Sequence, residues 1–325
     1  MFNLPTIPSS KELIDKAFRE GSKTAKIHRS TRAPHDKRMR KSEEQRVEIV
    51  GRELEIELRT ILKRFPQYED LSEFHRKLLD IKVDRDRYKH ALGAVHWCAK
   101  SIAQLRRETM RDMKGRRDAS GSMAFLGRAA SMVKRISKEL DELARIKAIL
   151  KEFPTVEDIP TAVVSGYPNV GKSTFMRNIT GSDVKVASYP FTTQSILIGH
   201  TMLGHFKHQV IDSPGLLDRP MDERNEIEMQ AVLAIKELAD VVIYIIDATQ
   251  DADAQLSLLE EIREKFDARI VVIVNKIDAV EKDIVDRVVG RLSGYKVYCI
   301  TANEPAECVK VFRDIWKKED GHRDD

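Results

Sequence analysis

Residues 166 to 173 read Gly-Tyr-Pro-Asn-Val-Gly-Lys-Ser, and this stretch decides the fold. It follows the apolar run Ala162-Val163-Val164 and precedes a segment that we expect to be helical. Two glycines separated by four residues and followed by lysine and serine form a P-loop between a strand and a helix. The glycines let backbone N–H groups turn toward a phosphate chain at the positive end of the helix. We therefore expect Lys172 to contact the β- and γ-phosphates and Ser173 a Mg²⁺ ion.

Two further polar segments follow apolar runs downstream. Asp212-Ser213-Pro214-Gly215 comes after Gln209-Val210-Ile211, and Asn275-Lys276-Ile277-Asp278 comes after the run from Ile270 to Val274. Asp212 is suited to hold Mg²⁺ through a water, and the Gly215 N–H to bond a γ-phosphate oxygen, so this segment is expected to act as a switch. A carboxylate at Asp278, helped by Asn275, accepts two hydrogen bonds from guanine but none from adenine. Each string alone is unspecific, and the set together predicts GTP rather than ATP.

These strings resemble the Obg/Nog class of P-loop GTPases. The resemblance includes Ser188-Tyr189-Pro190-Phe191-Thr192-Thr193 and the stretch from Gln209 to Ala239. Asp212 to Pro220 followed by Glu223 to Glu228 is similar to the nucleolar GTP-binding (Nog) branch, in a short archaeal-type version. The likeness covers residues 160 to about 303 and extends more loosely over the N-terminal half. It implies a GTPase that acts in large ribosomal subunit assembly, with GTP or GDP and Mg²⁺ as ligands.

The resemblance also implies roles for single residues. Thr193 is expected to complete the Mg²⁺ coordination and contact the γ-phosphate; the alternatives are Thr192, or that both threonines start a strand. Thr301-Ala302-Asn303 is expected to bring a backbone N–H to the guanine O6. The residues expected to act in hydrolysis are Lys172, Thr193, Gly215 and Asn169. The expected nucleotide-binding residues are Gly166, Tyr167, Pro168, Asn169, Val170, Gly171, Lys172, Ser173, Thr174, Asp212, Gly215, Asn275, Lys276, Asp278, Thr301 and Ala302.

The usual means of orienting the attacking water is missing. Many GTPases carry a glutamine after the Asp-x-x-Gly segment, whereas this chain has Leu216 there, which cannot form a hydrogen bond. Asn169 occupies the P-loop position at which related GTPases hold a K⁺ ion. One hypothesis is that K⁺ supplies charge beside the phosphates and accelerates otherwise slow turnover. The alternative is that Asn169 only stabilises the tight loop.

The charges divide unevenly along the chain. Residues 1 to 160 hold 36 Lys and Arg against 25 Asp and Glu, a net charge of +11, and the remainder holds 20 against 27, a net charge of −7. A basic half suits a polyanion such as RNA. Basic residues concentrate in Lys23 to Lys41 and in Lys100 to Arg117, which could equally be solvated surface. With the resemblance, they predict contact with large-subunit ribosomal RNA, through phosphate and shape rather than stacking because few aromatic residues accompany them.

The first half is predicted to be a helical bundle over residues 1–153. We expect helices at 10–25, 42–65, 71–82, 84–113 and 122–153, with a basic connector from His28 to Lys41. Their apolar stripes favour antiparallel packing, and an exposed partner-binding seam is the alternative. Three of these stripes are Val47, Val50, Leu54, Leu58, Ile61 and Phe65; Tyr88, Leu92, Val95, Ala99 and Ile102; and Leu126, Ala129, Val133, Ile136, Leu140 and Leu143.

After a linker at 154–160, strands alternate with helices over 161–318, and 319–325 form a short tail. We expect strands at 161–165, 195–203, 206–212, 240–247, 269–275 and 296–300. Helices are expected at 172–180, 222–238, 252–266, 281–291 and 305–317. Because 195–203 and 206–212 are too close for a crossover, they must form a hairpin. The result is an α/β fold with a mostly parallel sheet and one antiparallel edge strand, which binds nucleotide at the strands' carboxyl ends.

Other features bear on location and on competing functions. No apolar run approaches the roughly 20 residues of a membrane span, and three cysteines without metal spacing suggest reduced thiols. We expect a cytoplasmic, monomeric protein that does not contact membranes, and the short tail favours a compact, prokaryotic-type version. His200, His205 and His208 are expected to be surface residues rather than a metal site. The alternative functions are a GTP-binding module with negligible turnover and a GTPase that acts on another RNA such as tRNA.

Overall fold

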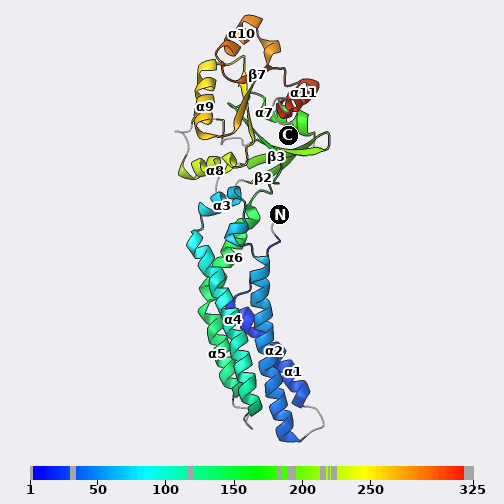
Figure 1. Cartoon of the computed structure of the whole chain (residues 1–325), viewed down its shortest axis with the longest axis vertical. Helices are drawn as coiled ribbons and strands as arrows, with labels where there is room; N and C mark the ends of the chain where they lie inside the picture. Colours follow the sequence, from blue (N-terminus) through cyan, green and yellow to red (C-terminus); the bar gives the residue numbers. More distant parts are fainter. Residues whose placement is uncertain are drawn as a thin grey trace, which may run out of the picture. The chain divides into compact units, whose positions relative to one another are not determined.

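Figure 1 presents the chain as a computed structural model, which describes residues 3–29, 34–115, 121–181, 184–188, 195–212, 217–218, 220 and 225–317. The chain forms two compact units. The helical unit comprises Met1–Leu71 and Lys82–Lys151, and the sheet unit comprises Ser72–Ile81 and Glu152–Asp325. The segment Ser72–Ile81 thus groups with the sheet, although the sequence analysis assigned it to the helical region.

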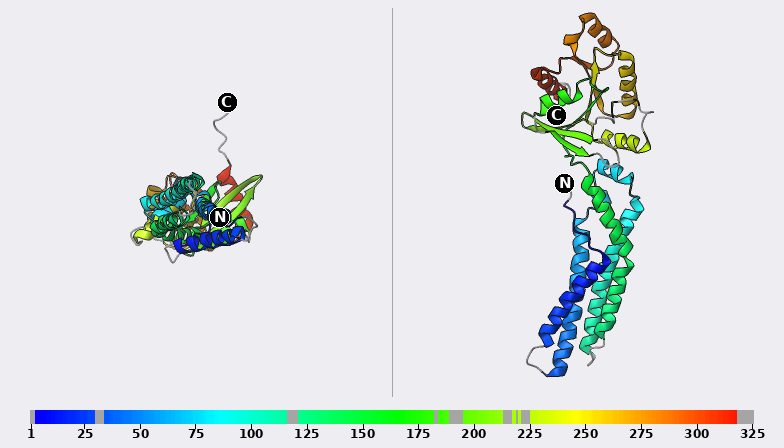
Figure 2. Two further views of the ribbon diagram at one scale, coloured as in Figure 1. Left: turned by 90° about the horizontal axis from the view of Figure 1, so that it is seen from below. Right: turned by 180° about the vertical axis from the view of Figure 1, so that it is seen from behind.

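The helical unit buries the apolar stripes predicted for it. Its long helices α1 (Ser10–Arg29), α2 (His35–Arg64), α4 (Arg85–Gly115) and α5 (Gly121–Arg135) run side by side in the views of Figures 1 and 2. η1 (Tyr68–Asp70) follows α2, and α6 (Ser137–Glu152) follows α5. Every residue of the three stripes is at most 5% exposed. The stripes therefore form a core, which rules out the exposed seam.

Two helix boundaries differ from the prediction. α1 ends at Arg29 and α2 begins at His35, so nine of the fourteen residues of the expected connector His28 to Lys41 are helical. Pro34 precedes α2 and Asp36 lies in its first turn, both of which favour a start there. The single helix expected at 122–153 is interrupted at Ile136, whose N–H bonds to Val133 three residues back rather than four. This tighter turn separates α5 from α6.

The sheet unit contains one seven-stranded sheet in the order β2-β3-β4-β1-β5-β6-β7. The strands are β1 (Thr161–Ser165), β2 (Val184–Ser188), β3 (Ser195–Leu203), β4 (Phe206–Asp212), β5 (Val241–Asp247), β6 (Arg269–Asn275) and β7 (Lys296–Cys299). β1 pairs in parallel with β4 and β5, and β5, β6 and β7 continue in parallel. β3 runs antiparallel to β4, which confirms the predicted hairpin. The mostly parallel sheet with an antiparallel edge is confirmed, but β2 was missed, and it adds a strand outside β3.

Helices cover both faces of this sheet. α7 (Lys172–Thr180) and α11 (Pro305–Trp316) pack on one face, over a core that takes alternate residues of β1, β5 and β6. α9 (Ala252–Lys265) packs on the other face, where the Tyr244 hydroxyl of β5 donates to the Gln255 carbonyl of α9. The remaining elements of the unit are α3 (Glu73–Asp80), α8 (Glu226–Lys236), η3 (Ile277–Ala279) and α10 (Lys282–Gly290). In the described part of the chain, no helix is both long and apolar enough to cross a membrane.

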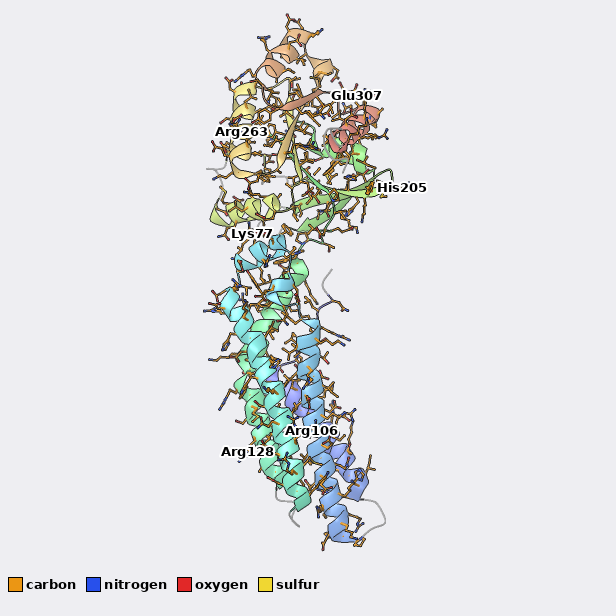
Figure 3. All side chains as sticks on the ribbon, viewed as in Figure 1. Lys77, Arg106, Arg128, His205, Arg263 and Glu307 are labelled. Atoms are coloured by element: carbon orange, nitrogen blue, oxygen red, sulfur yellow. The ribbon has the colours of Figure 1, made fainter. Side chains whose placement is uncertain are left out.

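The hairpin histidines do not share one environment. His205 lies at the exposed turn of the β3–β4 hairpin, as labelled in Figure 3. His208, by contrast, is 6% exposed, and its ring centroid lies 4.7 Å from that of Trp316. The surface prediction was therefore wrong for His208, because α11 covers that strand. Within the described residues, no group of three His, Cys, Asp or Glu side chains could hold a metal ion.

Candidate nucleotide-binding site

Four parallel strands end at one edge of the sheet and bring the predicted site residues together. Pairing places Val164 of β1 beside Asp212 of β4, and Asp247 of β5 beside Asn275 of β6. Asp212 and Asp247 are fully buried, and Asn275 is 2% exposed. Burying charged and polar groups costs free energy unless they are paired, so their concentration at one edge marks a candidate site.

The loop between β1 and α7 requires glycine at two positions. Gly166 and Gly171 have φ angles of 136° and 104°, which side chains rarely adopt. A Cβ at Gly166 would lie 2.3 Å from the Ile245 carbonyl oxygen, and one at Gly171 would lie 2.3 Å from Asn275 Nδ2. The loop can therefore pack this closely against β5 and β6 only with glycine, and its N–H groups lead into the N-terminus of α7 at Lys172.

Lys172 lies back across the loop that precedes it. Its Nζ donates to the carbonyls of Gly166 at 2.7 Å and Tyr167 at 2.8 Å, and the residue is 8% exposed. Burial lowers the pKa of Lys172, and the negative charges of Asp212 and Asp218 partly oppose that shift. An ammonium has three donors, so one remains available for a phosphate oxygen.

Ser173 and Asp212 meet at the predicted Mg²⁺ position. The Ser173 hydroxyl donates to Asp212 Oδ2 over 3.1 Å. A hydroxyl and a carboxylate are hard oxygen donors, and Mg²⁺ at nucleotide sites is usually held by few protein ligands together with phosphates and waters. The pair therefore fits such an ion.

Asn275 connects the P-loop to the loop after β7. Its Nδ2 donates to the Val170 carbonyl at 2.8 Å, and its Oδ1 accepts from the Ala302 N–H at 2.7 Å. Asn178 of α7 donates to the Ala302 carbonyl at 2.7 Å and holds the same loop from its other side. Asn275 was predicted to help select the base, whereas these two hydrogen bonds join two protein loops.

Lys276 makes a second connection to the P-loop. Its Nζ donates to the Asn169 carbonyl at 3.0 Å and to Asp247 Oδ2 at 2.6 Å. Asn169 and Lys276 are the two non-glycine residues with positive φ among those described, at 63° and 60°. The network therefore holds both residues in a backbone conformation that costs free energy.

Asp247 is a site residue that the sequence analysis missed. Burial would raise its pKa, but hydrogen bonds from Lys276 and Thr249 outweigh that effect, so the pKa of Asp247 is lowered. Gln255 of α9 accepts from the Asp247 N–H at 2.8 Å and donates to its carbonyl at 3.1 Å. The available signal was an aspartate at the end of an apolar strand, but its partner Lys276 lies 29 residues away.

Asp278 and Thr301 line a pocket beside the P-loop. The Thr301 hydroxyl donates to Asp278 Oδ1 at 3.0 Å, and the Thr301 N–H donates to Glu307 at 2.8 Å. The Asp278 side chain is exposed. The pocket has a volume of about 210 Å³, and it is lined by Asn169, Gly171, Thr174, Asn275, Lys276, Asp278, Ala279, Thr301, Ala302 and Asn303.

The switch segments are described only in part. Thr192, Thr193, Gly215 and Leu216 lie outside the described residues. The Leu217 carbonyl accepts from the Ser165 hydroxyl at 2.8 Å and from the Gly166 N–H at 3.3 Å. The segment after β4 is thus hydrogen-bonded to the start of the P-loop, a contact that the sequence analysis did not predict.

Known proteins match both units. The family "NOG1 N-terminal helical domain" matches residues 2–157, and the family "50S ribosome-binding GTPase" matches residues 161–276. An uncharacterized protein of Methanocaldococcus jannaschii is 38% identical over 288 residues, which cover 86% of this chain and 81% of that protein. The chain belongs to the nucleolar GTP-binding (Nog) family. Its sheet unit is a P-loop GTPase domain of that family.

Eukaryotic Nog proteins are longer than this chain. Nucleolar GTP-binding protein 1 of Saccharomyces cerevisiae is 33% identical over 297 residues, which cover 87% of this chain and 45% of that protein. The protein of the same name from Encephalitozoon cuniculi is 34% identical over 283 residues, 84% of this chain and 53% of that protein. The chain therefore spans about half the length of these two relatives.

Proposed function

We propose that the protein is a GTP-hydrolysing molecular switch that acts in large ribosomal subunit assembly. The observation that carries the nucleotide part is the joining of the P-loop, Asn275-Lys276 and Thr301-Ala302 around one pocket. Lys172 and the loop N–H groups bind the phosphates, and Ser173 and Asp212 hold Mg²⁺, with Thr193 as the expected third ligand. The ion neutralises charge that develops on the phosphates during hydrolysis. The protein works in the cytoplasm as a monomer.

Asp278 selects guanine in this proposal. Its carboxylate accepts from N1–H and from the exocyclic amine of the base, and the Thr301 hydroxyl, 3.0 Å from Asp278 Oδ1, orients it. Asp278→Asn replaces one acceptor with an N–H donor. This donor opposes the amine of guanine, which is also a donor, but it can bond the carbonyl that xanthine has at the same position. Calorimetry should show GTP affinity falling on the order of 100-fold while XTP affinity rises. An unchanged preference for GTP over XTP would show that another group reads the base.

Slow intrinsic turnover is expected because Leu216 cannot orient a water. Asn169 stands in the P-loop beside the pocket, and the Lys276 contact fixes its backbone. A K⁺ ion held there would add positive charge beside the phosphates. Single-turnover phosphate release should be faster in K⁺ than in Na⁺, and Asn169→Ala should abolish the difference without loss of GTP binding. Equal rates of phosphate release in K⁺ and Na⁺ buffers would show that Asn169 only stabilises the loop.

The helical unit docks on large-subunit RNA in this proposal. The match to the family "50S ribosome-binding GTPase" and the net charge of +11 over residues 1–160 support it. Because phosphate contacts release counterions, affinity for purified large-subunit particles should fall steeply with salt. GTP should change that affinity relative to GDP. A salt-insensitive interaction, or equal binding with both nucleotides, would contradict docking coupled to the switch.

The same measurements separate the competing functions. A binding module without turnover would hold GTP but release no phosphate in a single-turnover assay, with or without particles. A GTPase that acts on another RNA, such as tRNA, would retain that RNA after ultraviolet crosslinking in place of ribosomal RNA. Crosslinking in the presence of GTP and of GDP, followed by sequencing of the bound RNA, identifies the RNA target, and the single-turnover assay tests for hydrolysis.

A further inference from the structure

One face of the helical unit is depleted of acidic residues. Residues 87–107 on α4 and residues 121–138 on α5 and the start of α6 contain nine Lys and Arg and no Asp or Glu. This is unusual for a chain in which a third of the residues are charged. The remaining helical segments mix both signs of charge, so the depletion belongs to this part of the bundle.

Among the described residues, four outward cations of these stretches form no ion pair, whereas Lys89 contacts Glu69 and Arg87 interacts with Glu142. Lys100, Arg128, Lys134 and Lys138 are exposed, and within the described ranges no Asp or Glu pairs with them. Arg106 of α4 is different, because it contacts Glu48 and bonds Glu55 of α2 at 3.1 Å. Figure 3 labels Arg106 between α4 and α2 and Arg128 on the outer side of α5. The outward cations are therefore available to a polyanion.

Trp97 is the exposed indole among these cations. The other aromatic residues of the two stretches, Tyr88 and Phe125, are at most 1% exposed, whereas Trp97 is 41% exposed. The Arg135 guanidinium of α5 lies over its ring, 5.7 Å from the centroid. This contact orients the indole across α4 and α5, and the exposed remainder of the ring offers a flat apolar surface.

A glycine beside Trp97 has no internal packing role. Gly93 lies one helical turn before Trp97 on α4, and an added Cβ there would meet no heavy atom of the described structure within 4 Å. Gly21 and Gly51, by contrast, lie at close contacts, where a Cβ would lie 2.4 Å from Val50 and 2.6 Å from Arg106. A glycine inside a helix destabilises it relative to alanine. An external group that approaches the backbone closely would explain Gly93.

We propose that Trp97 is a stacking site for an unpaired base of single-stranded RNA. Phosphates of the same strand contact Lys100, one turn along α4, and Arg128, two turns before Arg135 on α5; from Trp97, both cations lie toward the end of the helix pair at which α4 ends and α5 begins. This inference rests on the proposed RNA docking and names its contact. The occupant is RNA rather than an acidic peptide because the site combines an indole face, which stacks on any base, with exposed cations on the same two helices.

Trp97 itself provides the assay. The chain has two tryptophans, so Trp316→Phe leaves Trp97 as the single indole. Short oligouridylate should quench the Trp97 fluorescence in a saturable manner. An abasic oligoribonucleotide of equal length carries the same phosphates without bases, and it should bind with little quenching. Equal quenching by the two oligonucleotides would overturn stacking.

Matched substitutions test the energetics. Trp97→Ala should weaken oligouridylate binding about 5- to 150-fold, the range for loss of one base stack, and Trp97→Phe should restore most of it. Met123→Ala removes another side chain of these stretches, 68% exposed, and should leave affinity unchanged. Gly93→Ala should raise the Tm but lower RNA affinity, a combination that a purely structural glycine would not produce. The proposal is rejected if Trp97→Ala binds oligouridylate within twofold of wild type while Arg128→Ala binds it more weakly. The contact would then be electrostatic only.

Two further readouts separate this proposal from the function on which it rests. If wild-type protein binds no GTP, the proposed switch fails whatever Trp97 does. If GTP binding and particle binding are intact but Trp97→Ala changes neither oligouridylate affinity nor quenching, only the stacking site fails. Binding to particles that depends on Trp97 and survives ribonuclease digestion would identify a protein contact and also reject the RNA assignment.

Discussion

The two units place their charges in opposite ways. Among the described residues of the sheet unit, three Asp, Glu, Lys or Arg side chains are buried, and all three, Lys172, Asp212 and Asp247, lie at the candidate site. The described part of the helical unit buries one such side chain, Glu43, which Arg29 and Ser122 bond at 2.7 Å each. Its other described charges are at least partly exposed. Buried charges are costly and need fixed partners, which suits a small, defined ligand, whereas charges in water suit a large polyanion bound through many weak contacts.

Removing the buried lysine should have the largest effect. Lys172→Ala deletes the ammonium that lies across the P-loop and that we propose binds the phosphates. Loss of such charge stabilisation typically costs about 10²- to 10³-fold in turnover. Phosphate release should fall by that factor, while binding of the helical unit to RNA in the absence of nucleotide should not change. Weakened RNA binding would show that the two charge arrangements are not independent.

Asp247→Ala should test whether the missed carboxylate supports the site. The substitution leaves the Thr249 N–H and Lys276 without their partner, and such unpaired groups cost about 1–3 kcal/mol. Chemical denaturation should show this loss, and calorimetry should show weaker GTP binding because Lys276 no longer holds Asn169. Glu264→Ala, at an exposed position of α9, provides a control in the same unit. Normal GTP affinity in a destabilised Asp247→Ala protein would limit Asp247 to folding.

Arg106 and Arg128 form a matched pair within the helical unit. Arg106→Ala removes contacts with Glu48 and Glu55 and packing against Gly51, so we expect a loss of about 1 kcal/mol in stability. Arg128→Ala should change the free energy of unfolding by less than about 0.5 kcal/mol. It should also reduce the slope of log RNA affinity against log salt concentration by about one. Thermal melts and salt titrations of both variants measure this. The comparison fails if the two variants behave alike.

The smallest effect concerns pH. His75 of α3 is 9% exposed. Its Nε2–H donates to the Pro154 carbonyl, and in the neutral ring Nδ1 accepts from the Ser72 hydroxyl. Burial lowers the pKa of His75, and the Pro154 bond only partly opposes this. The folded state therefore prefers neutral His75. Its contribution to stability is complete above the unfolded pKa of about 6.5 and is lost as pH falls from there through the folded pKa. The Tm should drop less steeply between pH 7.5 and 5.5 in His75→Gln than in wild type.

Residue spacing within single segments predicted the elements whose structure depends on neighbouring residues in the chain. The P-loop, the strands that hold Asp212 and Asn275, and the buried stripes of α2, α4 and α5 follow from spacing within one segment. β2 was missed although Val184 and Val186 alternate with Lys185, because five residues give a weak signal and its pairing with β3 decides it.

Long-range partners account for the rest. Asp247 gains its role from Lys276, and Leu217 from Ser165 and Gly166. Neither pair has a spacing that a pattern could show. The same is true of Trp97, because its exposure and its contact with Arg135 of α5 depend on how the two helices pack. Tertiary contacts, rather than propensities, decide these three assignments.

The two bonds of Asn275 have a consequence for chemical probes. One side chain joins the Val170 and Ala302 backbones, so the walls of the pocket proposed to bind the base form during folding rather than when a ligand binds. A rigid pocket spares a small fragment the entropic cost of organising it. Guanine-like heterocycles without any phosphate are therefore expected to bind the nucleotide-free protein. Inhibitors could start from such compounds rather than from charged triphosphate mimics, which do not cross membranes.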